Sequence, residues 1–436
     1  TGGSNNLSLS TGNNIANSDI AFDGAISGLG NLTLADVGGT ATFSANVAVA
    51  ALSADSTVAN ITFTGSTNTF SAASTLANDG TLTFGNSTDD SFTFNGGLTT
   101  SSVGGTVTLN TNISSSDDAL TFGAITLGNN VTIDTNSTTT NRADISIGAV
   151  TGGSNTLTLT TENNVTGSDI TASGAISGVT TLTLASVGGT ATLSGDVDVT
   201  TLAVDNTVAN VAFTGNGSSV TNAVSFANDG TLTLGTSGGT QTYNAGLTTT
   251  SVGGTVTLNG TIASSDDAIT LGAVTLGSAT TIDTNSTTTN RADITIGAVT
   301  GGSQNLTLST EDNITGADIT ASGAISSVGA LTLNNVGGTA TLSGDVDAES
   351  LTVDNTVANV ALTGDGSTIT NTFQPSNDGT LVIGDASGDT LTFNGGINES
   401  TTGTVTLSGS IVSSNDAITF GAITLGADTT ITSAGG

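Results

Sequence analysis

Apolar and small polar residues alternate along most of this chain. Leucine alternates with serine or threonine in the segments 7–10, 157–160 and 306–309, and valine, threonine and leucine follow one another in 107–109 and 256–258. A period of two places aliphatic side chains on one face of a strand and hydroxyl side chains on the other. Threonine is β-branched and suits the exposed face. The pattern therefore predicts short, half-buried strands of about four to six residues.

Turn-forming residues separate these runs. Gly-Gly, Asn-Asp-Gly, Asn-Gly and Ser-Asp-Asp recur between them, and glycine, asparagine and aspartate tolerate the positive φ that tight turns need. No stretch carries apolar residues at helical spacing, so we expect an all-β fold with no helices. The residues to which we assign a structural role in the Asn-Asp-Gly turns are Asn78, Gly80, Asn228, Gly230, Asn377 and Gly379.

The strands and turns recur in three copies. The phrase Thr-Gly-Gly-Ser begins each of the segments 1–150, 151–299 and 300–436, and the third copy stops before the end of the pattern. A long internal repeat is typical of a structural scaffold whose role is to form an extended body. We expect 1–436 to be one continuous solenoid, with each copy a set of coils. Because the first residue is Thr, we also expect a longer, processed polypeptide.

Two all-β architectures compete for this pattern. A string of immunoglobulin-like sandwiches usually contains a buried Trp or a corner Tyr in each domain, whereas this chain has no Trp, one Tyr and one Pro. A parallel β-solenoid instead stacks short strands coil on coil with small residues at the corners, which fits the 60 glycines. At about 20–25 residues per coil we predict about 18–22 coils.

The composition limits which partners and cellular locations fit the protein. There are 35 acidic residues, two arginines and no lysine, which gives a net charge of −33. This charge argues against nucleic-acid binding, since phosphates are neutralised by Lys and Arg. No apolar run approaches the ~20 residues of a membrane span, so we expect no membrane insertion. The absence of cysteine is compatible with an exported protein that folds without disulfides, and we expect an extracellular or cell-surface location.

Some phrases resemble a known family. The Gly-Thr-Val-Thr-Leu-Asn-Gly-Thr-Ile run at 254–262 and the recurring Gly-Ala-Ile-Thr-Leu-Gly phrase are similar to the repetitive passenger regions of filamentous-haemagglutinin-like adhesins and other giant bacterial surface proteins. The resemblance implies a right-handed parallel β-helix that is exported across an outer membrane and forms a stalk or fibre. The family's secretion-domain signature and the calcium-binding nonapeptide of repeat toxins do not occur in the sequence.

Catalytic chemistry has few candidates here. Without His, Lys or Cys the usual bases for nucleophilic catalysis are missing, so we expect no enzyme and no organic cofactor. Paired aspartates in Ser-Ser-Asp-Asp turns are the exception, and they are Asp117, Asp118, Asp266 and Asp267. We interpret them as solvated corners. Carboxylate and carbonyl oxygens also suit a weak calcium site, and two carboxylates can perform acid–base work, so these alternatives stay open.

The two cations of the chain have a predicted structural role. Arg142 precedes Asp144 by two residues, and Arg291 precedes Asp293 in the same way. We expect each arginine to form a local or inter-coil ion pair that neutralises a crowded acid. Sugar binding by an arginine is the alternative. The threonines of 190–192 would also suit ice binding, although threonine is common on strand faces.

The function predicted from these patterns is structural. We expect a segment of an extracellular fibre or stalk that associates head-to-tail, because terminal coils expose open strand edges. A surface polysaccharide is a further expected partner. One alternative is a subunit of a surface layer or matrix. Another is a β-helical polysaccharide-binding or -cleaving protein, which would need an aromatic- or carboxylate-lined groove in one copy only.

Overall fold

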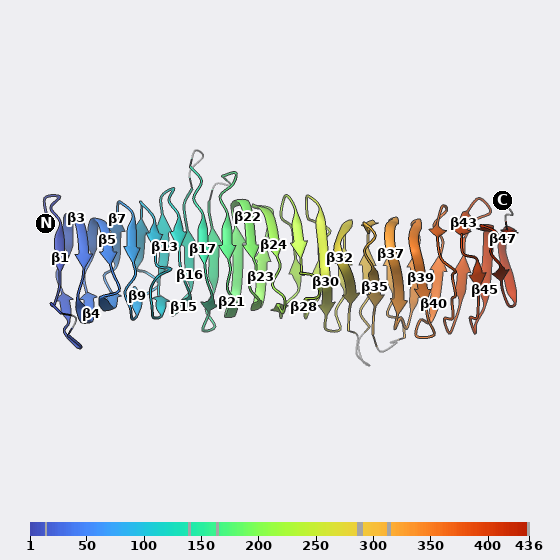
Figure 1. Cartoon of the computed structure of the whole chain (residues 1–436), viewed down its shortest axis with the longest axis horizontal. Coiled ribbons are helices and arrows are strands. Elements are labelled where there is room, and N and C mark those ends of the chain that lie inside the picture. Colours follow the sequence, from blue (N-terminus) through green and yellow to red (C-terminus); the bar gives the residue numbers. More distant parts are fainter. Residues whose placement is uncertain (14, 138–140, 163–164, 286–290, 312–314, 434–436) are drawn as a thin grey trace. The chain divides into compact units, whose positions relative to one another are not determined.

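The protein is a parallel β-solenoid of about 20 turns (Figure 1). The computed structural model describes residues 1–13, 15–137, 141–162, 165–285, 291–311 and 315–433. These residues form 47 strands and no helix, so no helix among them has the length and apolarity to cross a membrane. The predictions of an all-β fold, of parallel coils and of their approximate number are confirmed.

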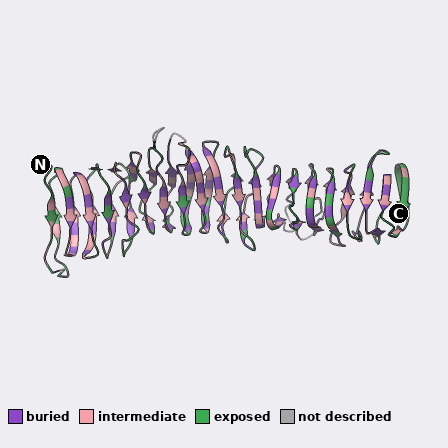
Figure 2. Cartoon of the chain, turned by 45° about the horizontal axis from the view of Figure 1, so that its top comes forward, coloured by how far each residue is buried: buried purple, intermediate pink, exposed green. Residues whose placement is uncertain are grey.

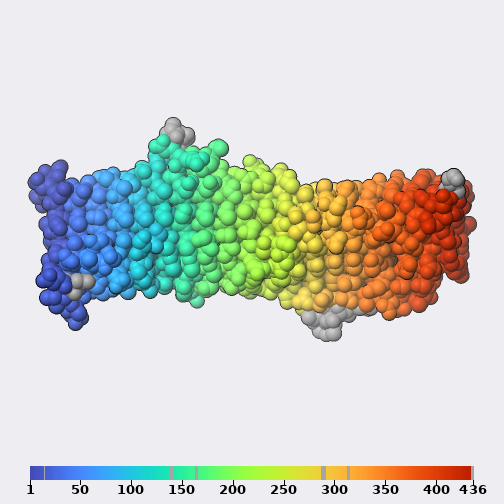
Figure 3. Space-filling view, in the orientation of Figure 1, coloured from blue at the N-terminus to red at the C-terminus, as the bar shows by residue number. Residues whose placement is uncertain are grey.

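The chain divides into two compact units, which are described separately. The first comprises Thr1–Gly215 and Asn228–Gly230, and the second comprises Asn216–Ala227 and Thr231–Gly436. Within each unit the coils follow one another in chain order, as the successive colour bands of the surface show (Figure 3). Every strand pairing given for either unit is parallel, as in β2–β4 and β33–β36.

The strands of the first unit are β1 (Leu7–Leu9), β2 (Ile20–Phe22), β3 (Ile26–Leu34), β4 (Val37–Phe43), β5 (Val47–Ala54), β6 (Val58–Phe63), β7 (Thr67–Phe70), β8 (Ser74–Leu76), β9 (Leu82–Phe84), β10 (Ser91–Phe94), β11 (Leu98–Thr99), β12 (Val107–Leu109), β13 (Asn112–Ser115), β14 (Leu120–Thr121), β15 (Ile125–Leu127), β16 (Val131–Asp134), β17 (Ile145–Ile147), β18 (Val150–Thr151), β19 (Leu157–Thr160), β20 (Ile170–Ala172), β21 (Ile176–Ala185), β22 (Val187–Leu193), β23 (Val197–Val204) and β24 (Val208–Phe213).

The strands of the second unit are β25 (Ser219–Val220), β26 (Val224–Ser225), β27 (Leu232–Leu234), β28 (Thr240–Tyr243), β29 (Leu247–Thr248), β30 (Val256–Ser264), β31 (Ile269–Leu271), β32 (Val274–Asp283), β33 (Ile294–Ile296), β34 (Val299–Thr300), β35 (Leu306–Ser309), β36 (Ile319–Ala321), β37 (Ile325–Asn334), β38 (Thr339–Leu342), β39 (Val346–Val353), β40 (Asn359–Leu362), β41 (Thr368–Ile369), β42 (Leu381–Ile383), β43 (Thr390–Phe393), β44 (Ile397–Asn398), β45 (Val405–Ser413), β46 (Ile418–Thr419) and β47 (Ile423–Ser433).

The core of each unit is a set of aliphatic and aromatic stacks. Buried and partly exposed residues alternate along the strands, as the period of two predicts (Figure 2). In the first unit, Phe22, Phe43, Phe63 and Phe84 occupy matching positions on consecutive coils. The centroids of the stacked rings lie 5.8, 4.9 and 5.9 Å apart along this series. Parallel in-register pairing thus places like side chains on top of one another inside the coil.

Several strands are longer than predicted. They contain up to 11 residues, because the chain bends at a corner without leaving the ladder. In β21 the bend falls at Gly178, whose φ of 66° lies in the left-handed region that glycine adopts without strain. The pairing of β21 with β23 shifts register at this glycine. Sequence alternation alone does not reveal such a bend, since the apolar pattern resumes after it.

Candidate functional site

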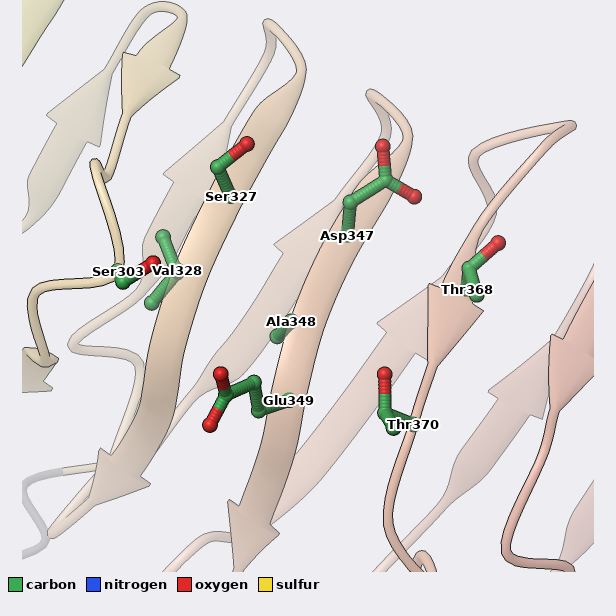
Figure 4. A pocket seen from close by; sticks show the side chains of 8 residues that line it. All are labelled: Ser303, Ser327, Val328, Asp347, Ala348, Glu349, Thr368 and Thr370. Carbon is green, nitrogen blue, oxygen red and sulfur yellow. The ribbon is translucent and has the colours of Figure 1, made fainter.

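The second unit carries a groove on the outer face of three adjacent strands, β37, β39 and β41 (Figure 4). Its volume is about 410 Å³. Asp347 and Glu349 project from β39 as exposed side chains, and the buried Ala348 lies between them. The remaining lining residues are Ser303, Ser327, Val328, Thr368 and Thr370.

A bulge in β37 shapes this groove. Ile325 pairs with Val346, but the next paired residue is Val328, opposite Ala348, so the register shifts between them. Ser327, in the bulge, has a φ of 55°. An extra residue at a bulge bends the strand and redirects its side chains. The bend lies beside β39, and the nearly buried Val328 and Ala348 lie beneath the groove.

The first unit contains a groove at the equivalent place in copy one. Its volume is about 390 Å³, and residues of β3, β5 and β7 line it. Gly28 occupies the position of Ser327, with a φ of 68°. The two positions that carry carboxylates in copy three are Ala48 and Ala50 in copy one. The shape therefore recurs with the repeat, whereas the charge does not.

The same two positions in copy two are Asp198 and Thr200, both exposed on β23. The number of carboxylates thus rises from none in copy one, through one in copy two, to a pair in copy three. Sequence analysis missed this series, although a residue-by-residue comparison of the copies contains the signal. A carboxylate-lined groove in one copy only is the feature that the alternative of a ligand-binding solenoid required.

The paired aspartates lie in tight turns. Asp117 and Asp266 adopt φ values of 68° and 67°, and Asn415 adopts 66° at the same position of copy three. In each turn the hydroxyl of a preceding serine donates to the carbonyl of the second acid, as Ser413 does to Asp416 at 2.6 Å. The arrangement fits a turn of defined geometry, in which Asn and Asp are interchangeable.

The two arginines pack against the following coil. A Cβ on Gly167 would lie 2.9 Å from Nη1 of Arg142, and Gly316 stands in the same relation to Arg291 at 2.7 Å. The acids two residues later bond to the following coil as well, since Asp144 Oδ1 accepts a hydrogen bond from the Asp169 N–H at 2.9 Å. Asp293 accepts in the same way from the N–H of Asp318. The ion pairs expected within these segments stay predictions.

The Asn-Asp-Gly turns are held by side-chain amides. Asn78, Asn228 and Asn377 are fully buried. The Asn78 amide donates to the carbonyls of Gly80 and Thr81, each at 3.0 Å, and so closes its own turn. Gly80 is required because a Cβ there would lie 2.5 Å from the Ala59 carbonyl oxygen of the preceding coil.

Two aspartates, each beside a glutamate of the next coil, have raised pKa values that sequence analysis did not anticipate. Burial raises the pKa of Asp134 to about 6. A hydrogen bond from the backbone N–H of Asn136 opposes this rise, and the negative charge of Glu162 on the next coil adds to it. Burial likewise raises the pKa of Asp283 to about 6, with Glu311 contributing through its charge and a hydrogen bond. The first pair joins copies one and two and the second joins copies two and three, so the repeat builds the same electrostatic feature twice.

A third acid pair occurs at a corner of the second unit. A hydrogen bond with Asp389 raises the pKa of Asp365, and the charge of Asp389 adds to it. Burial acts to raise the pKa of Asp389, but the N–H groups of Ala386 and Asp385 lower it below its usual value. These two N–H groups donate to Oδ2 of Asp389 at 2.9 and 2.7 Å. One carboxylate therefore closes a turn while its neighbour faces solvent.

The described part of the chain contains no group of three or more carboxylate, imidazole or thiolate side chains that could hold a metal ion. The weak calcium site left open as an alternative at the paired aspartates stays untested. Comparison with protein-family models, curated proteins and solved structures finds no match.

Proposed function

We propose that this chain is a structural segment of an extracellular fibre or stalk on a bacterial surface, similar in role to the repetitive regions of filamentous-haemagglutinin-like adhesins. The observation that carries the proposal is the repetition of the same inter-coil bond in all three copies. An aspartate accepts from a threonine N–H one coil later, at 2.7 Å each time, and the pairs are Asp19–Thr40, Asp169–Thr190 and Asp318–Thr339.

Such repetition suits a protein whose function is extension. Each coil contacts its neighbours only, so stability grows by adding equivalent interfaces and no unique centre is needed. The net charge of −33 keeps the surface hydrated and opposes lateral association. The lack of His, Cys and Lys supports a non-enzymatic role.

Head-to-tail association is part of this proposal. Among the described residues β47 pairs with β45 in parallel. By the repeat, β47 corresponds to β32 and β1 corresponds to β35. Within the chain β32 pairs with β35, so β47 of one copy has the pattern to receive β1 of a second.

The proposal is tested by locating the protein on intact cells of its source. Antibodies raised against the purified chain should label unpermeabilised cells, and brief treatment with an external protease should remove the label. Label that appears only after the cells are opened would overturn an extracellular role.

A further inference from the structure

The groove of copy three has the features of a binding site for a cationic partner. From Asp347, Glu349 and the hydroxyl side chains around them we propose that it binds an extended protein segment with lysine or arginine at alternate positions. The proposal goes beyond the structural role proposed above, and neither depends on the other.

The spacing of the two carboxylates favours an extended peptide. Asp347 and Glu349 are two residues apart on β39, so their Cα atoms lie about 6.6 Å apart along the strand. Side chains at positions i and i+2 of any extended peptide have the same separation and point the same way. A segment that runs along β39 can therefore place two consecutive outward cations over the two acids.

The hydroxyl side chains of the groove complement the rest of such a segment. Val328 and Ala348 are apolar but only 1 and 5% exposed, so a partner in the groove meets mainly the acids and the hydroxyl side chains. The hydroxyls of Ser327, Thr368 and Thr370 line the groove (Figure 4). Hydroxyls can both donate to and accept from a peptide backbone.

Charge complementarity supports the same occupant. The chain has only two cations of its own, Arg142 and Arg291, and neither lines the groove. Its carboxylates are therefore open to a partner's cations. A volume of about 410 Å³ is much larger than a bare metal ion needs. The equivalent groove of copy one offers the same shape without acids, which makes it a control inside the same molecule.

The test measures the binding of two labelled peptides by fluorescence anisotropy. In one peptide lysine alternates with serine, and in its isomer the same lysines are consecutive. We expect the alternating peptide to bind about tenfold more tightly, because two paired charges contribute about 1.4 kcal/mol when both are aligned. Equal binding of the isomers would show a general attraction to the acidic surface and would overturn the proposal.

Substitutions taken from the repeat itself localise the site. Asp347→Ala with Glu349→Ala installs the residues of copy one and should weaken the alternating peptide about tenfold. Asp117→Asn with Asp266→Asn removes the same charge at turns where copy three has Asn415, and it should leave binding unchanged. Equal loss in both double variants would contradict a specific groove.

A gain of function completes the test. Ala48→Asp with Ala50→Glu transfers the acid pair to the groove of copy one and should raise the stoichiometry from one peptide per chain to two. An unchanged stoichiometry would overturn the proposal, because the grooves share their shape. If spermidine or a chitosan oligomer displaces the peptide at an equal concentration of charge, the occupant is a polyamine or a polysaccharide, and the assignment to a protein segment fails.

Discussion

The carboxylate of Asp169 lies directly against Gly189 of the neighbouring coil. A Cβ on Gly189 would lie 2.1 Å from Oδ1 of Asp169, the same atom that accepts the N–H of Thr190 at 2.7 Å. The carboxylate thus occupies the space that the missing side chain leaves. Gly39 and Gly338 stand in the same relation to Asp19 and Asp318. The aspartate of the preceding coil therefore leaves room only for glycine at the second glycine of each Val-Gly-Gly-Thr phrase.

Removing the acceptor should loosen this corner locally. We expect Asp169→Ala to speed hydrogen exchange at the Thr190 N–H about tenfold, because a hydrogen bond to a charged group contributes about 1.5 kcal/mol or more. Asp169→Asn keeps an oxygen acceptor and should change exchange far less. Mass-spectrometric exchange on a peptide covering Thr190 measures both. Similar exchange in the two variants would show that the side-chain bond does not protect the corner.

The phenylalanine stack of the first unit predicts a graded loss of stability. Phe63 is fully buried between Phe43 and Phe84, so Phe63→Ala should cost about 3–5 kcal/mol. Phe63→Leu should cost less than about 1.5 kcal/mol, since Leu362 fills this position in copy three. Urea unfolding followed by circular dichroism gives the order of midpoints. An alanine variant as stable as the leucine variant would show that the ring stack contributes little.

The acid pair at Asp283 predicts a pH dependence of stability. Its folded pKa of about 6 exceeds the ordinary aspartate value of 3.8, so the protonated group stabilises the fold fully below about pH 4, and that contribution is lost as pH rises through 6. Asp283→Asn should therefore raise stability at pH 7.5 by about 1 kcal/mol, allowing for solvent screening. At pH 4 it should match the parent.

The exposed Asp198 supplies the control for charge. Asp198→Asn removes one exposed carboxylate without that buried environment, and its effect on stability at pH 7.5 measures the contribution of net charge alone. Thermal unfolding of the parent and both variants at pH 4 and 7.5 makes the comparison. A gain at pH 7.5 in Asp283→Asn no larger than that in Asp198→Asn would attribute it to lower net charge and not to the shifted carboxyl.

The correspondence of β47 to β32, which pairs with β35, predicts the effect of a charged substitution on association. Leu425→Asp with Ile431→Lys places charges where a second copy would stack, and it should reduce head-to-tail association measured by analytical ultracentrifugation. The exposed pair Asp198 and Thr200 on β23 can be replaced by alanine as a control that should associate like the parent. Unchanged association of the β47 variant would place any self-contact elsewhere.

Much of the fold could be predicted from the sequence, because alternation with a period of two survives in every copy. Strand positions such as 157–160 and the turn at Asn78 follow from side-chain type alone. The bends at Gly178 and Ser327 could not be predicted, since a bulge preserves the apolar pattern on both sides. The groove depends on such a bend, and so Asp347 and Glu349 were not identified as a pair.

The raised pKa of Asp134 shows a second limit of prediction from the sequence. Asp134 and Glu162 are 28 residues apart and interact only because consecutive coils stack. The sequence shows that coils exist, but not which corner residues share a column. The contiguous Ser-Ser-Asp-Asp turns are recognisable in the sequence as a motif. Single acids that lie close together only across coils have no neighbouring residues that mark them as a pair.

The central claim, that this chain is a segment of a surface fibre or stalk, is tested most directly by electron microscopy of the native source. Gold-labelled antibody against the chain, applied to negatively stained cells, should mark filaments or stalks that project from the surface. Label over a regular two-dimensional lattice, or a signal confined to the cell interior, would contradict the account.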